Sequence, residues 1–176
     1  MWIIPFAAIA LGVIALDQAS KLLILNFLYE DQLELIPGIL RFTYVENRGM
    51  AFGLLADHRW VFMVISTAAI VGLLLYVGIA KPKSRFEILS LAFIIGGGIG
   101  NMIDRIWLGY VIDFIDFCAF PKLWMWIFNV ADACVCIGAG MLVLWMVLDI
   151  IRDEKAKKAA LAGAAETPDE NGEKDA

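Results

Sequence analysis

The sequence predicts an all-α integral membrane protein with four transmembrane helices and a small β-rich subdomain outside the membrane. Hydrophobic residues make up 61% of the 176-residue chain, well above the roughly 45–50% that is usual in soluble domains. Only 19% of the residues are charged. Several apolar runs also approach or reach the roughly 20 residues that a helix needs to cross the hydrocarbon layer of a bilayer. A bilayer rather than water is therefore the expected solvent.

Four apolar runs account for the predicted helices. They cover about Trp2–Leu28, Trp60–Ala80, Ile88–Leu108 and Ile127–Leu148. The first run lacks the basic start and the small-residue cleavage site of a signal peptide, so we expect it to be a retained helix.

The basic residues predict the orientation of these helices. The short connection Lys81–Arg85 carries three basic residues in five, and more follow Arg152. The two longer connections, over about residues 29–59 and 109–126, have four basic residues spread over many more positions, among acidic ones. Because basic residues concentrate in cytoplasmic loops, both termini are expected in the cytoplasm and the longer connections outside.

The first longer connection changes from a helical to an alternating pattern. Leu40, Phe42 and Tyr44 alternate with Arg41 and Thr43 after a Pro-Gly pair, which is typical of a strand that follows a turn. A small sheet within about residues 29–59 is expected, and an extended loop is the alternative.

Composition also changes near the C-terminus. Residues 1–152 form the predicted membrane domain, whereas residues 153–176 are low in complexity and poor in large apolar side chains. A disordered cytoplasmic tail is therefore expected over residues 153–176.

Polar residues interrupt three of the apolar runs. A charged residue in mid-membrane costs roughly 2.5–3.5 kcal/mol, so each one needs an explanation. All of them fall near the outer ends of their helices, at one membrane depth. They are Asp17 and Lys21 in the first run, Asn101, Asp104 and Arg105 in the third, and Asn129 and Asp132 in the fourth.

Some of these residues have structural explanations. Asp17 and Lys21 have the i, i+4 spacing of a helical ion pair, and mutual neutralisation is the expected role. Arg105 can pair with a carboxylate or extend to the interface. Asn101 and Asp104 share a helix face, which leaves support and substrate contact both open. The glycine run 96–100 has the spacing of close helix packing rather than of a phosphate site.

Asp132 is harder to explain structurally, because it is the only charged residue between Leu123 and Leu148. Its candidate partners are Asp113 and Asp116, in the connection that returns to this helix. Two carboxylates that share a proton can activate a water molecule and protonate a leaving amine. The residues therefore favour hydrolysis by an acid pair, with the choice between Asp113 and Asp116 open.

Other function classes are less consistent with the sequence. A net charge of −5 without a basic stripe argues against nucleic-acid binding. Three cysteines and one histidine form neither a zinc-ligand pattern nor an evident cysteine–base pair. A carboxylate-lined ion or proton carrier is the alternative, although the inner halves of the second and fourth runs are apolar.

Four motifs occur in one order between Leu16 and Cys136, and together they resemble those of signal peptidase II, the bacterial lipoprotein signal peptidase. The motifs are Asp17-Gln18 with Lys21, residues 46–52 (ENRGMAF), residues 100–105 (GNMIDR) with 109–114 (GYVIDF), and residues 128–132 (FNVAD). Each motif alone is weakly specific, but the ordered set on four apolar runs is highly specific.

The resemblance implies a site and a reaction. Asp113 and Asp132 would be catalytic. Asn47, Gly49, Asn101, Arg105 and Asn129 would shape the substrate site, and Asp17, Lys21 and Asp104 would support it. The enzyme would remove the signal peptide of a prolipoprotein by cleaving before its diacylglyceryl-modified cysteine.

The resemblance also implies a location, partners and an inhibitor. The protein would lie in the bacterial cytoplasmic (inner) membrane, with its active site near the outer surface of that membrane. Its partners would be prolipoproteins and membrane lipid, with no nucleic acid. It would need no metal or organic cofactor, and globomycin-type inhibitors would occupy the substrate site.

Overall fold

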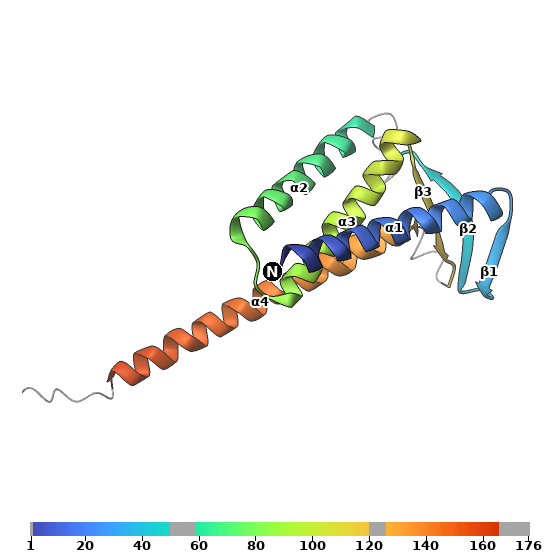
Figure 1. Ribbon diagram of the computed structural model, residues 1–176. Helices are drawn as coiled ribbons and strands as arrows, with labels where there is room; N and C mark the ends of the chain where they lie inside the picture. The colour runs from blue at the N-terminus through green and yellow to red at the C-terminus, as the bar shows by residue number, and fades with distance from the viewer. Residues whose placement is uncertain (1, 50–58, 120–125, 166–176) are drawn as a thin grey trace, which may run out of the picture. The chain divides into compact units, whose positions relative to one another are not determined.

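The computed structural model describes residues 2–49, 59–119 and 126–165, and this part of the chain contains four long helices (Figure 1). The helices are α1 (Ile3–Phe27), α2 (Arg59–Ala80), α3 (Arg85–Trp107) and α4 (Val130–Ala165). All four are long and apolar enough to cross a membrane. The predicted spans are therefore confirmed, with ends shifted by a few residues except in α4, which continues past the predicted end at Leu148 to Ala165.

The chain divides into two compact units, residues 1–142 and 143–176. The first unit holds α1, α2, α3, the sheet and the beginning of α4. The described part of the second unit is the rest of α4, which is helical to Ala165. The expectation of disorder is therefore wrong for residues 153–165, where alanine, lysine and glutamate favour a helix. Residues 166–176 lie outside the described part of the chain.

Helix α3 lies against each of the other helices of the first unit. Three of its glycines each allow the close approach of a different helix. A Cβ atom on Gly96 would lie 2.8 Å from the Ala10 carbonyl oxygen of α1, and one on Gly98 would lie 3.2 Å from Ile70 of α2. A Cβ atom on Gly97 would collide with the Ala131 carbonyl oxygen of α4. The glycine run thus serves close helix packing, as predicted.

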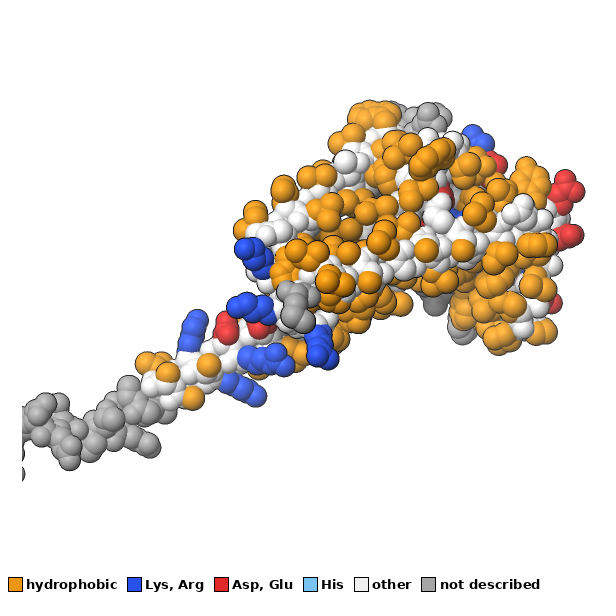
Figure 2. Space-filling view, viewed as in Figure 1, with side chains coloured by type: hydrophobic (Ala, Val, Ile, Leu, Met, Phe, Trp, Pro, Cys, Tyr) orange, Lys and Arg blue, Asp and Glu red, His pale blue; other side chains and the backbone are white. Residues whose placement is uncertain are grey.

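The outer surface of the helices in the first unit is apolar. Ile4 and Ile79 are 76% and 80% exposed, and Figure 2 shows hydrophobic side chains over most of the visible face of these helices. Apolar patches of this extent are rare on monomeric soluble proteins, and they are expected where the solvent is lipid.

A four-stranded antiparallel sheet follows the end of α1 and the end of α3. Its strands, in spatial order, are β1 (Gln32–Ile36), β2 (Leu40–Asn47), β3 (Val111–Phe117) and β4 (Ile127–Phe128). Strands β1 and β2 are joined at Gly38, which has a φ of 69°. The predicted small sheet is confirmed, and the extended-loop alternative is wrong. Strand β3 was not predicted, and it pairs Asp113 with Val45 of β2.

Candidate active site

A buried cluster of three charged side chains joins α1 to α3. The Lys21 ammonium lies 2.8 Å from a carboxylate oxygen of Asp17 and 2.8 Å from one of Asp104. All three side chains are almost completely buried, and buried charges require such pairing. The predicted ion pair of Asp17 and Lys21 is present, and Asp104 completes it.

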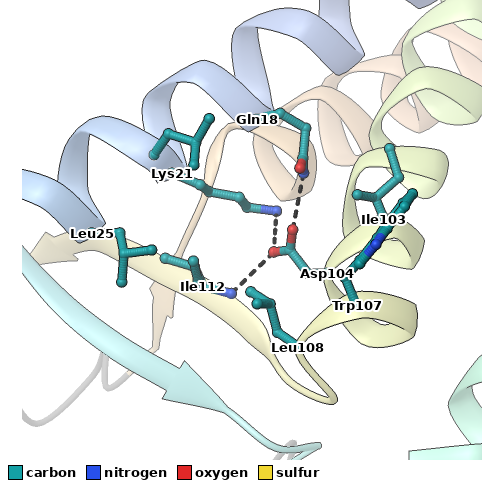
Figure 3. A pocket seen from close by; sticks show the side chains of 9 residues that line it. Gln18, Lys21, Leu25, Ile103, Asp104, Trp107, Leu108 and Ile112 are labelled. Carbon is teal, nitrogen blue, oxygen red and sulfur yellow. Dashed lines mark hydrogen bonds and ion pairs between the residues drawn. The ribbon is translucent and has the colours of Figure 1, made fainter.

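The two carboxylates of this cluster also bind backbone groups of β3 and α4. Asp104 accepts the backbone N–H of Ile112 at 3.1 Å and the Gln18 side-chain amide at 2.9 Å (Figure 3). Asp17 accepts the backbone N–H of Ala131 at 2.9 Å. This N–H lies in the first turn of α4, where helix donors have no partner within the helix. The cluster therefore connects α1, α3, β3 and α4.

Asn101 connects the charged cluster to Asp132. Its side-chain oxygen accepts hydrogen bonds from Lys21 at 3.0 Å and from Asn129 at 3.0 Å. These two donors define which end of the amide is the oxygen. Its Nδ2 consequently points to Asp132 and donates to Oδ1 over 2.8 Å.

Asn129 and Asp132 form a reciprocal cap at the start of α4. The side-chain oxygen of Asn129 accepts the backbone N–H of Asp132 at 2.9 Å, and Oδ2 of Asp132 accepts the backbone N–H of Asn129 at 3.3 Å. This is the geometry of a capping box, with aspartate in the place usually taken by glutamate. The spacing of the FNVAD motif is therefore explained by helix capping.

Asn129 also holds Asp113. Its Nδ2 donates to Oδ1 of Asp113 over 2.7 Å, while Asn47 donates to Oδ2 over 2.8 Å. The Asp113 side chain is only 2% exposed. One asparagine thus contacts both acidic residues, and it lies completely buried between them.

Gly49 orients Asn47 toward Asp113. The backbone N–H of Gly49 donates to the side-chain oxygen of Asn47 over 3.0 Å, which leaves the Nδ2 of Asn47 for Asp113. Gly49 has a φ of 99°, a conformation that glycine adopts without steric cost. The rest of this motif, residues 50–52, lies outside the described residues.

Burial raises the pKa of Asp113 to about 7, and the negative charge of Asp132 raises it further in the same direction. The hydrogen bonds from Asn47 and Asn129 act in the opposite direction but are weaker. Near neutral pH the Asp113 carboxyl group is therefore protonated in part of the molecules. A site with one protonated and one ionised carboxyl group is suited to acid–base chemistry.

Asp116 lies elsewhere. Its carboxylate is 2.6 Å from Nε of Arg41, its register partner on β2. Side chains on a strand alternate between its two faces, so residues 113 and 116 point in opposite directions. Of the two candidate partners of Asp132, the structure brings Asp113 to it.

A cavity of about 300 Å³ lies next to Asp132, between α2, α3 and the start of α4. Its lining is largely apolar, with Ser66, Asn101, Arg105 and Asp132 as polar groups. Arg105 donates to the carbonyl oxygen of Asn101 over 3.3 Å. The cavity could accommodate an apolar segment with its polar end directed to the carboxylate.

The described residues thus include all ten predicted site residues, and these form one connected region. Gln18 was missed as a site residue, although its amide donates to Asp104 and to the Gly100 carbonyl oxygen. Its position at the outer end of the first apolar run, next to Asp17, could have identified it. Within the described ranges, no group of three or more His, Cys, Asp or Glu side chains could hold a metal ion.

Comparison with known proteins gives consistent matches. The family model described as signal peptidase (SPase) II matches residues 9–148. The lipoprotein signal peptidase of Symbiobacterium thermophilum is 40% identical over an alignment of 147 residues, and the match covers 80% of this chain and 92% of that protein. The one of Halothermothrix orenii is 42% identical over 139 residues, covering 78% and 92% respectively. A bacterial membrane enzyme solved at 2.3 Å resolution has a TM-score of 0.75 at 29% identity, covering 83% of this chain and 89% of that chain.

Proposed function

The chain belongs to the signal peptidase II family of proteases, and we propose that Asp113 and Asp132 are its catalytic pair. Members of this family remove signal peptides from prolipoproteins, and this is the function of the chain. The observation that carries the proposed pair is the contact of one buried asparagine, Asn129, with both acidic residues. Nothing in the described region favours the ion-carrier alternative.

The proposed reaction uses one ionised and one protonated carboxyl group. The ionised group removes a proton from a water molecule, whose oxygen attacks the carbonyl carbon of the scissile peptide bond. The protonated group donates a hydrogen bond to the carbonyl oxygen while negative charge develops there, and it transfers that proton to the leaving nitrogen as the C–N bond breaks. The proton taken from water remains on the other carboxylate. The raised pKa of Asp113 supports this division, because it keeps a proton on the pair near neutral pH.

The proposed substrate is a prolipoprotein with a diacylglyceryl-modified cysteine, cleaved immediately before that cysteine. Its acyl chains would remain in lipid, and its apolar signal segment would enter the cavity beside Asp132. Arg105 and Asn101 at the cavity would contact the substrate, while Asn47, Gly49 and Asn129 would shape the site around Asp113. Globomycin-type inhibitors would occupy the same cavity.

We place the protein in the bacterial cytoplasmic membrane, with both termini in the cytoplasm. The basic connection between α2 and α3 supports this orientation. The acidic pair lies at the opposite end of α3 from that connection, so it would lie near the outer membrane surface. A substrate would then reach it by lateral diffusion.

A cleavage assay with two forms of one substrate tests the proposal. Purified protein in detergent micelles would be incubated with a diacylglyceryl-modified prolipoprotein and with its unmodified form. We expect cleavage of the modified form alone, before the modified cysteine, as determined by mass spectrometry of the products. Equal cleavage of both forms would contradict the proposed role of the lipid.

A further inference from the structure

A second cavity, of about 430 Å³, lies at the end of the first unit opposite the candidate active site. It is lined by Trp2, Pro5, Pro82, Lys83, Arg85 and Ile88. These residues come from the start of α1, the connection between α2 and α3, and the start of α3. The cavity therefore lies where three segments enter or leave the apolar part of the bundle.

Among the residues that the structure describes, the two basic side chains of this cavity have no acidic partner. Lys83 and Arg85 are exposed, and within the described ranges neither forms an ion pair. The nearest carboxylate along the chain, Glu87, is buried and accepts a hydrogen bond from the Tyr76 hydroxyl group at 2.8 Å. The cavity is therefore positively charged at its open side.

The start of α3 adds backbone donors to this charge. Ser84 is the N-cap residue of α3 but makes no side-chain cap hydrogen bond. The first N–H groups of a helix carry partial positive charge when no cap satisfies them. The first backbone N–H groups of α3 and the side chains of Lys83 and Arg85 therefore together favour binding of one anionic group in the cavity.

The other walls of the cavity are apolar. Trp2, Pro5 and Ile88 provide them, and tryptophan is enriched where helices meet the membrane–water interface. A soluble anion would use only the basic side of such a cavity, whereas a phospholipid would use both sides. Basic pockets between transmembrane helices are known to suit anionic lipid headgroups.

We propose that this cavity binds the headgroup phosphate of an anionic phospholipid, in the leaflet that faces the α2–α3 connection. Lys83 and Arg85 pair with the phosphate, and the glycerol and upper acyl region lie against Trp2 and Ile88. The site is separate from the acidic pair, so the proposal does not depend on the catalytic assignment.

Native mass spectrometry of the full chain in micelles tests this proposal. The protein would be titrated with phosphatidylglycerol, which is anionic, and with phosphatidylcholine, which is zwitterionic. The double variant Lys83→Gln/Arg85→Gln removes both cavity charges. The matched control Lys157→Gln/Lys158→Gln removes two exposed charges from the second unit, outside the cavity.

We expect the unsubstituted protein to bind phosphatidylglycerol more tightly than phosphatidylcholine. The cavity variant should bind phosphatidylglycerol about thirtyfold more weakly, since each basic residue near a membrane surface contributes about 1 kcal/mol. The control should change little. Cleavage activity in neutral detergent should be unchanged in both variants, which checks that they fold.

Three results would overturn the proposal. They are unchanged phosphatidylglycerol affinity in the cavity variant, an equal loss in the control, and displacement of the lipid by millimolar inorganic phosphate. The last result would assign the cavity to a soluble anion.

Discussion

The carboxylate of Asp17 in α1 accepts the backbone N–H of Ala131 in α4 at 2.9 Å. Ala131 directly precedes Asp132, so a side chain of the first helix fixes the turn that carries one member of the acidic pair. Asp17 is itself held by Lys21. The position of Asp132 therefore depends on a charged cluster that includes neither aspartate of the pair.

Lys21→Met should be strongly destabilising. It leaves the carboxylates of Asp17 and Asp104 buried without their shared cation, and loss of one partner of a buried ion pair costs about 3–5 kcal/mol. Asp17→Asn should cost less, because Lys21 keeps Asp104 and the amide oxygen can still accept from Ala131. Thermal unfolding in micelles would measure both. Equal stability of Lys21→Met and the unsubstituted protein would contradict the role of the cluster.

Asp113→Asn and Asp132→Asn should each reduce cleavage of a lipidated prolipoprotein by at least about a hundredfold, the lower end of acid–base contributions. Asp116→Asn is the matched control, since it changes the same strand at a residue that pairs with Arg41 and not with Asn47 or Asn129 in the described part of the chain. EDTA should leave cleavage by the unsubstituted enzyme unchanged. Near-normal turnover by either of the first two variants would exclude the proposed pair.

The pKa of Asp113 predicts how stability depends on pH. Burial raises this pKa to about 7 from about 3.9 in an unfolded chain, so the folded state binds the proton more tightly. The resulting stabilisation is complete below about pH 4 and is lost as pH rises toward 7. The Asp113→Asn variant has no carboxyl group at this position, so its stability does not fall in this way as the pH rises.

The comparison of two proteins at two pH values measures this effect. The stability of Asp113→Asn relative to the unsubstituted protein should increase between pH 5 and pH 8, in denaturant titrations in micelles. A difference that is constant with pH would show that the Asp113 pKa is not raised.

Gly97→Ala should lower both stability and activity. Its Cβ atom would collide with the Ala131 carbonyl oxygen, and overpacking of this kind costs about 1–3 kcal/mol. Because backbone is displaced, the turn that carries Asp132 should move. Gly12→Ala is the control, since a Cβ atom there meets nothing within 4 Å and alanine favours a helix. If both variants behave alike, close packing at Gly97 is not required.

The orientation can be tested with single cysteines in a variant without Cys118, Cys134 and Cys136. A cysteine substituted for Ser84 or for Ala160 should not react with a membrane-impermeant thiol reagent in intact cells, because both positions are expected in the cytoplasm. Cysteine at Gln32, in the exposed strand β1, should react. The opposite labelling pattern would place the acidic pair on the cytoplasmic side.

The sequence was sufficient to predict the helices because four apolar runs have the length of a membrane span. It also predicted β2, since Leu40, Phe42 and Tyr44 alternate with Arg41 and Thr43. Strand β3 was missed because buried residues occupy successive positions from Val111 to Phe114, which removes the alternation of a half-buried strand.

The residues that the structure brings together at the candidate site could be named from the sequence, but the contacts between them could not. Asp132 was identified because no other charge lies in its apolar run. The residues alone could not choose between Asp113 and Asp116, since that choice depends on which face of β3 each side chain occupies. The two roles of Asn129, as helix cap and as a ligand of Asp113, depend on three-dimensional contacts that spacing does not give.

The placement of the acidic pair has a consequence for biogenesis. Asp132 lies on the last helix, whereas the groups that hold it come from α1, through Asp17, and α3, through Asn101. The ribosome releases α1 and α3 before α4. Nascent chains that have not yet inserted α4 therefore carry only half of the acidic pair, and on the proposed assignment peptidase activity would begin only after α4 has packed.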